Sequence, residues 1–228
     1  MGAIRDELKE AVAQSGRDFY DKGLTWGRDA GDTSIRDDRT GYVYILPMPG
    51  SALRIPTWAS VAAKDVAVVD SAGRNVGDAE VHPTVELLTH LRIYQHRPDA
   101  GALVHSHGRW TRVFAALRQP LPSLMMDQFK YTGASALRCA RIGPAGSDQV
   151  AMSAVECLGE HAKVVLLAAH GAVCLGEDME EALSVAEIAE DMARLAICAR
   201  SLGDPPEVTL ADFVDEAVAR ASLLHREV

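Results

Sequence analysis

The chain has 228 residues, 48% of them hydrophobic, which is enough to bury the core of a single domain spanning residues 1–228. Its 32 acidic residues outnumber its 23 basic ones, and the net charge of −9 disfavours binding to nucleic-acid phosphates or to anionic membranes. No apolar run reaches the roughly 18 residues of a membrane-spanning helix, and the charged N-terminus lacks the apolar segment of an export signal. We therefore expect a cytoplasmic protein whose partners are small molecules and other subunits.

The first half of the chain predicts two helices and two strands. Apolar residues recur at near-helical spacing over 3–22 and a glycine follows, which predicts an amphipathic helix that ends there. The segments 42–46 and 65–70 each favour a strand bounded by loops. A further helix is expected over 84–97, where Thr84 would cap the first turn and a proline follows the last.

The second half alternates strands and helices in the same way. Residues 101–107 show the alternation of a strand, and a helix over 110–117 follows. The nearly continuous apolar run 164–170 is typical of a strand covered on both faces. Acidic residues at the start of 177–202, basic ones near its end and a glycine after it predict a long helix, and 209–224 predicts a last amphipathic one. Together these elements indicate one mixed α/β domain.

Three histidines are candidates for a metal site. His105 and His107 lie one residue apart on a predicted strand, so both imidazoles point the same way and are close enough to chelate one ion. The alternative is a pair of half-buried structural histidines. His170 ends an apolar strand and precedes a glycine, which lets the strand end open onto a cleft. If His170 folds back onto the first pair, three imidazoles leave a position for substrate, as in catalytic metal sites.

Two segments together resemble the class II aldolase/adducin family. In the first, Glu86 opens a helix, an Arg-Pro-Asp turn follows, and a strand delivers the two histidines up to His107. The second, residues 169–176, is similar to the later histidine-glycine segment of the family and also precedes a long helix. The similarity extends from about Ile4 to Leu202, and the joint spacing of the two motifs is more specific than either motif alone.

The resemblance implies a central, largely antiparallel β-sheet flanked by helices, in a homotetramer with active sites between neighbouring subunits. It also implies one divalent cation per subunit held by His105, His107 and His170. Zinc is the first expectation, with manganese, iron or cobalt as alternatives that suit the same ligands. Glu86 is implied as the acid/base residue that can also ligate the ion in the absence of substrate. The alternative for Glu86 is that it only complements the dipole of its helix.

Phosphosugar members of the family bind phosphate through a glycine-rich segment near the N-terminus and through later threonine, glycine and serine residues. This chain offers a partial set of candidate substrate-binding residues: Arg28, Asp32, Gly50, Ser51 and Thr84. Acidic side chains in the first segment would repel a phosphate dianion, although Arg28 could offset one of them. We therefore expect a substrate without phosphate in the usual place. The alternative for this segment is an acidic surface loop in which Asp32 hydrogen-bonds a turn.

The aldolases of the family also use tyrosines at the subunit boundary as proton donors, and these are not evident here. Tyr131 or Asp127 is a candidate replacement, although either can equally be structural. Arg109 and Arg112, just past the histidine pair, could grip a carboxylate through bidentate hydrogen bonds, with simple surface solvation as the alternative.

The expected function is a divalent-metal-dependent lyase that performs retro-aldol cleavage of a small hydroxy-carbonyl, sugar-like substrate. In that chemistry a carboxylate beside the cation moves a substrate proton while the metal stabilises the resulting enediolate. Alternatives within the family are decarboxylation of a metal-chelating hydroxy acid, epimerisation of a pentulose phosphate and dehydration of a thio-ribulose phosphate. An adducin-like scaffold is the non-enzymatic alternative, and it would be expected to lack the ligand histidines, all three of which are present.

Overall fold

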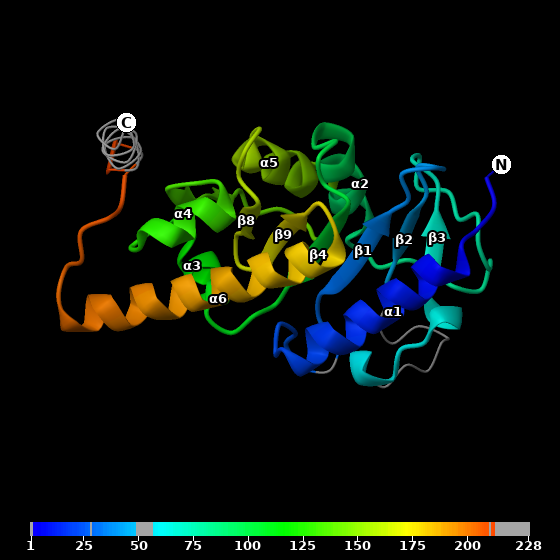
Figure 1. The fold of residues 1–228 in the computed structure, drawn as a ribbon, viewed down its shortest axis with the longest axis horizontal. Helices are drawn as coiled ribbons and strands as arrows, with labels where there is room; N and C mark the ends of the chain where they lie inside the picture. The colour runs from blue at the N-terminus through cyan, green and yellow to red at the C-terminus, as the bar shows by residue number, and fades with distance from the viewer. Residues whose placement is uncertain (1, 28, 49–56, 210, 213–228) are drawn as a thin grey trace, which may run out of the picture.

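The computed structural model describes residues 2–27, 29–48, 57–209 and 211–212 of the chain. The predictions made for Arg28, Gly50 and Ser51, and most of the helix expected over 209–224, lie outside these residues. The described residues form one α/β domain, in which a seven-stranded sheet runs through the middle and helices pack on both of its faces (Figure 1).

The central sheet has the strand order β3-β2-β1-β4-β9-β8-β7. Its strands are β1 (Asp32–Arg36), β2 (Val43–Ile45), β3 (Ala67–Val69), β4 (Ala102–Ser106), β7 (Cys139–Ala140), β8 (Val164–Leu167) and β9 (Ala172–Gly176). Neighbouring strands are antiparallel except β7 and β8, which are parallel. A separate two-stranded sheet pairs β5 (Leu121–Pro122) with β6 (Ala136–Leu137). The largely antiparallel α/β architecture expected from the resemblance is confirmed.

Helices cover both faces of the sheet. They are α1 (Asp6–Asp21), α2 (Leu87–His96), α3 (Thr111–Leu117), α4 (Met126–Thr132), α5 (Asp148–Leu158) and α6 (Met179–Leu202). Two short 3₁₀ helices, Trp58–Ser60 and Ala63–Asp65, lie against α1. Helices α1 and α6 lie on one face, and α2 and α5 lie on the other (Figure 1). Among the described helices, none combines the length and the apolarity that crossing a bilayer requires.

The sheet is buried on both faces because each helical layer brings its own apolar cluster. In β4, Ala102 and Val104 face the layer that contains α6, whereas Leu103 between them faces the layer of α2 and α5. Helix α6 presents small buried residues such as Ala182 and Ala189 to β4 and β9, so it lies close to the sheet. The central strands are therefore rigidly held, which suits them to carry functional side chains.

Most elements expected from the sequence are present, with shifted ends. The strand expected over 164–170 stops at Leu167, because β8 turns there to pair with β9, and His170 lies in the turn. The helix expected from Thr84 begins at Leu87 with Glu86 at its N-cap position. Thr84 still accepts a hydrogen bond from the backbone N–H of Glu86, at 3.2 Å. Its hydroxyl thus lies just before the helix and orders the residues that enter it.

The interpretation of the segment around Asp32 as an acidic surface loop is wrong. Asp32 begins β1, and only 2% of its surface is exposed. Strand β1 lies between β2 and β4, with Asp32 opposite His105. The sequence pattern did not predict this strand because its residues, Asp-Thr-Ser-Ile-Arg, are mostly polar and show no apolar alternation.

Gly101 provides a test of how closely the chain is packed before β4. Its N–H donates to the carbonyl of Gly176, and a Cβ at this position would overlap the carbonyl oxygen of Glu177. We expect Gly101→Ala to lower the free energy of unfolding by about 1–3 kcal/mol, because backbone atoms must move to relieve the overlap. Gly203→Ala is the matched control, since nothing lies within 4 Å of a Cβ there. Denaturant unfolding of both variants checks the prediction, which fails if they are equally stable.

Candidate metal centre

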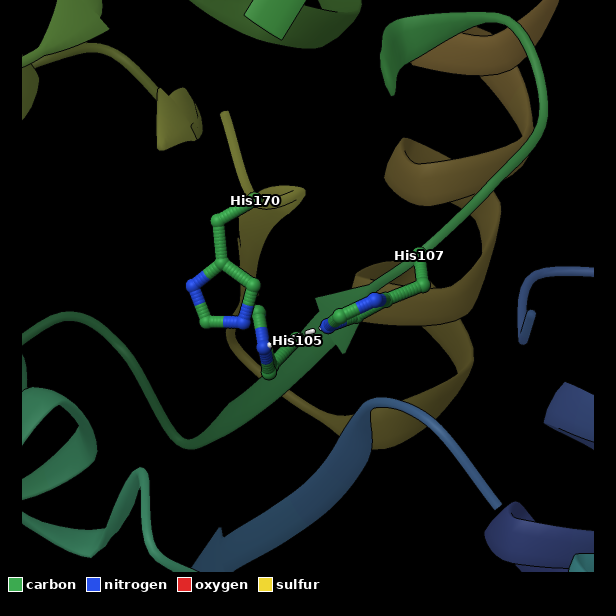
Figure 2. Close-up of side chains that lie close together, drawn as sticks. All are labelled: His105, His107 and His170. Atoms are coloured by element: carbon green, nitrogen blue, oxygen red, sulfur yellow. Dashed lines mark hydrogen bonds between the residues drawn. The ribbon is translucent and has the colours of Figure 1, made fainter. Parts of the chain in front are cut away.

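The three histidines predicted from the sequence converge. His105 lies on β4, His107 follows that strand directly, and His170 lies in the turn between β8 and β9. Each pair of imidazole rings has its centroids 4.8 Å apart, and the candidate ligand nitrogens all lie within 4.8 Å of one another. Figure 2 shows the three rings turned toward a common space. Nitrogens this close can bind a single ion after small adjustments of the side chains.

Strand pairing explains why His170 reaches the other two. Strands β4 and β9 are antiparallel, with Ser106 opposite Ala172, so the turn that precedes β9 lies beside the end of β4. The turn can approach because Gly171 has no side chain: a Cβ there would overlap the carbonyl oxygen of Ser106 and lie 3.3 Å from Cδ2 of His107. Ala169 adopts a positive φ of 57°, which completes the tight reversal of the chain.

A backbone hydrogen bond orients the most buried of the three imidazoles. Nδ1 of His105 lies 3.1 Å from the carbonyl oxygen of Ala172, and a carbonyl accepts only if Nδ1 carries the proton. The lone pair of His105 is then on Nε2, which lies 3.1 Å from Nε2 of His107. A tetrahedral ion with bonds of about 2.1 Å places its ligand nitrogens about 3.4 Å apart, so the pair is already near chelating geometry.

The environment keeps two of these imidazoles uncharged. Burial lowers the pKa of His107 to about 3, and repulsion from His105 and His170 contributes. Burial and repulsion from His105 also lower the pKa of His170, partly opposed by Glu86. His107 and His170 are therefore neutral at pH 7, which is the form of imidazole that binds metal ions.

Glu86 brings a carboxylate to the same place. It is 3% exposed, its Oε2 accepts a hydrogen bond from the hydroxyl of Thr89 at 3.1 Å, and its Oε1 lies 4.0 Å from Nε2 of His170. Oε1 is buried and has no hydrogen-bond partner among the described residues. An unpaired buried carboxylate oxygen is costly, and a cation or a substrate proton beside it removes the cost. The donor set of three imidazoles and one carboxylate thus fits a divalent metal ion.

A buried polar network positions Glu86 and the histidine strand relative to each other. His90 on α2 is fully buried, with its Nε2 2.9 Å from Oδ1 of Asp32 and its Nδ1 2.7 Å from the hydroxyl of Ser34. The hydroxyls of Ser34 and Tyr94 are 2.8 Å apart, and Thr84 donates to Oδ2 of Asp32 at 2.7 Å. The network therefore joins α2, which follows Glu86, to β1, which pairs with the strand of His105.

Among the described residues, none of the remaining candidates forms a side-chain hydrogen bond or an ion pair with the three histidines. Arg109 is exposed and lines a cavity of about 410 Å³ against α6. Tyr131 is 46% exposed on α4, where the ammonium of Lys130 lies 5.3 Å from its ring. Asp127 is also exposed on that helix. Arg112 is half-buried, with its guanidinium 4.6 Å from the centre of the Trp26 ring. Asp32 and Thr84 lie in the buried network, a role that the sequence did not indicate.

Comparison with known proteins points to one family. The family model described as class II aldolase and adducin N-terminal domain matches residues 10–197. A 5-deoxy-D-ribulose 1-phosphate aldolase of Bacillus thuringiensis serovar kurstaki is 31% identical over 202 residues, 89% of each chain. An L-fuculose phosphate aldolase of Methanococcus maripaludis is 30% identical over 183 residues, 78% of this chain and 89% of that protein. A solved structure of an L-fuculose 1-phosphate aldolase matches with a TM-score of 0.83 at 25% identity, over 92% of this chain and 93% of that one.

The buried network gives a prediction about stability that can be tested in metal-free protein. Burial alone would raise the pKa of Asp32, but His90, His105 and the hydrogen bond from Thr84 together outweigh burial, and the pKa is lowered. We expect Asp32→Asn to lower the free energy of unfolding at pH 7 by about 1–3 kcal/mol, because a buried charged acceptor is lost. The stabilisation is present above the unfolded aspartate pKa of about 3.9 and is lost as the pH falls from there through the folded-state value.

The measurement is denaturant unfolding of both proteins between pH 3 and neutrality, in steps of about half a unit across the range in which carboxylates titrate. The difference in the free energy of unfolding between wild type and Asp32→Asn should become smaller toward pH 3. Asp191→Asn is the control, since Asp191 is exposed on α6 and forms no hydrogen bond or ion pair in the described part of the chain. A gap that is independent of pH would contradict the prediction.

Proposed function

The chain belongs to the class II aldolase and adducin family, and on that premise we propose that it is a metal-dependent lyase of the aldolase type. The observation that carries the proposal is the cluster of three imidazoles beside an unpaired, buried carboxylate oxygen of Glu86. A scaffold protein has no need of such a cluster, whereas a lyase of this family does. The proposed reaction is reversible cleavage of a carbon–carbon bond in a small hydroxy-ketone.

The proposed substrate class rests on the names of the relatives more than on the acidic N-terminal segment of the sequence. Both curated relatives are named for aldolases that act on sugar phosphates. This favours a short sugar phosphate over the substrate without phosphate that the acidic N-terminal segment suggested. We propose a small sugar-like hydroxy-ketone that carries an anionic group.

His105, His107 and His170 would hold the divalent cation, with zinc first and manganese, iron or cobalt as alternatives. When bound, such a cation supplies Lewis acidity that polarises a carbonyl and stabilises the negative charge that develops on its oxygen. The fixed tautomer of His105 and the lowered pKa values of His107 and His170 keep the nitrogen lone pairs available at neutral pH.

Glu86 is proposed as the acid/base residue. Thr89 binds one of its oxygens and leaves Oε1 free on the side of His170. From this position Oε1 can hold the proton that passes to the carbon atom released by cleavage, and can take it back in the direction of condensation. The burial of Glu86 excludes bulk water from this oxygen, so the proton is exchanged with substrate rather than with solvent.

A second proton-transfer group is needed for the substrate hydroxyl, and the family resemblance implies that a neighbouring subunit supplies it. We propose a homotetramer with active sites between subunits. Tyr131 and Asp127, the two candidates from the sequence, are both exposed on α4. We propose that one of them acts on the site of an adjacent chain, as the resemblance implies for the tyrosines of the family.

The metal proposal predicts that His170→Ala removes the ion. After loading with zinc and gel filtration, wild type should retain about one ion per chain, and His170→Ala less than about a tenth of that. The reason is that His105 and His107, even with the carboxylate of Glu86 nearby, leave the ligand set one imidazole short. Inductively coupled plasma mass spectrometry measures the content. His161→Ala is the control, because this histidine is exposed after α5. Wild type that holds neither zinc nor manganese would favour a scaffold.

The catalytic proposal predicts a separation of metal binding from turnover. Glu86→Gln should lower kcat for retro-aldol cleavage by about 10²–10⁴-fold, because the amide cannot exchange a proton, while metal content stays near that of wild type. A panel of ketose phosphates and hydroxy-carboxylates, assayed for released aldehyde or carbon dioxide, identifies the substrate first. Glu160→Gln, at an exposed glutamate after α5, controls for the loss of one negative charge. Full activity of Glu86→Gln would rule out the assignment.

A further inference from the structure

An arginine stacked on an exposed tryptophan lies at the edge of the histidine cluster. The guanidinium carbon of Arg112, on the first turn of α3, is 4.6 Å from the centre of the Trp26 ring. Trp26 belongs to the segment that follows α1 and is 55% exposed. A planar guanidinium stacked on the face of a tryptophan is held in orientation.

Both members of the pair are anchored to the segment that carries the histidines. The carbonyl of Leu24 accepts hydrogen bonds from the backbone N–H of His107 at 2.9 Å and from the hydroxyl of Ser106 at 3.1 Å. At the other end of the loop, Gly31 packs so tightly that a Cβ would overlap the carbonyl oxygen of His105. Helix α3 begins four residues after His107. The Trp26–Arg112 pair is therefore fixed relative to the histidines.

Arg112 has a positive charge that the described part of the chain does not neutralise. Arg5, Arg92 and Arg97 each form an ion pair with a carboxylate, whereas Arg112 forms none within 4.0 Å. A half-buried, oriented guanidinium with free N–H groups is a ready partner for an oxyanion.

The structure also shows that Arg112 and Arg109 have different neighbours, which the sequence could not reveal. Arg109 lines the cavity against α6, where Glu187, Glu190 and Asp191 are nearby acidic residues. Arg112 instead stacks on the loop that contacts His107, on the side of the cluster.

We propose that Arg112, held in place by Trp26, binds an oxyanion of the substrate, a carboxylate or a phosphate, next to the atoms that chelate the metal. The inference rests on the proposed function, since it takes the three histidines to be the metal site. Arg112 is then a specificity-determining residue that contacts substrate, and Trp26 is a positioning residue that acts through it. Substrates that lack an anionic group beside the chelating atoms would be discriminated against.

The test measures binding to the zinc-loaded full chain by titration calorimetry, with three probes. Glycolate supplies only a chelating hydroxyl and carboxylate, and tartronate adds a second carboxylate. Phosphoglycolate keeps the carboxylate and carries a phosphate ester in place of the free hydroxyl. In Arg112→Gln, the affinity for tartronate, phosphoglycolate or both should fall about tenfold or more, whereas the affinity for glycolate should change less than about twofold. A loss confined to one of the larger probes identifies which oxyanion Arg112 binds.

Further variants separate binding from folding. Arg112→Lys keeps the charge without the planar fork and should bind the larger probes with intermediate affinity. Trp26→Leu should weaken the same probes and leave glycolate unaffected, and Trp26→Phe should recover most of the loss. The matched control is Arg200→Gln, because Arg200 also stacks on an aromatic ring, that of Phe114 at 5.6 Å, but on α6. Thermal melts confirm that each variant is folded.

The two proposals fail in different ways. Glycolate that does not bind zinc-loaded wild type overturns the metal site, and the role of Arg112 falls with it. If glycolate binds zinc-loaded wild type, the metal site stands. If the affinities for tartronate and phosphoglycolate then fall no more in Arg112→Gln than in Arg200→Gln, only the role of Arg112 is overturned.

Discussion

The antiparallel pairing of β4 with β9 is the constraint on which the candidate site depends. It places Ser106 opposite Ala172 and so brings the turn that carries His170 against the end of the strand that carries His105. His170 is far from the other two in the sequence, and a one-residue slip in the pairing would turn every side chain of the shifted strand to the other face of the sheet. Two clusters of buried apolar residues, one on each face, hold this register.

Beside the sheet, buried polar groups fix the position of α2 and of the residues before Glu86 relative to β1. Asp32, His90 and Ser34 connect β1 to α2, and Thr84 ties the residues just before Glu86 to the same network. Such a network is stable only when its members satisfy one another, since each unpaired polar atom in the interior is costly. Oδ1 of Asp32 and Nε2 of His90 at least face each other at 2.9 Å, whereas Oε1 of Glu86 has no hydrogen-bond partner among the described residues and lies 4.0 Å from Nε2 of His170. The unsatisfied group lies where the chemistry is proposed.

Sequence patterns predicted the histidines and the long helix but not the network. His105 and His107 could be assigned to one face because period-two alternation is visible in a short strand, and α6 has clear signals at both ends. Strand β1 was missed because its polar residues make their contacts with partners distant in the chain, which no local pattern records. The difference between Arg109 and Arg112 was equally hidden, since it depends on which neighbour each side chain meets.

The hydrogen bond between Nδ1 of His105 and the carbonyl of Ala172 has a thermodynamic consequence. The same carbonyl belongs to the strand that pairs with β4, so strand register and imidazole tautomer are linked. A ligand that draws on the Nε2 lone pair polarises the ring and strengthens its donation to Ala172. By reciprocity, an ion bound at the centre would oppose local opening of these two strands, and hydrogen exchange of their backbone amides would report whether the ion is present.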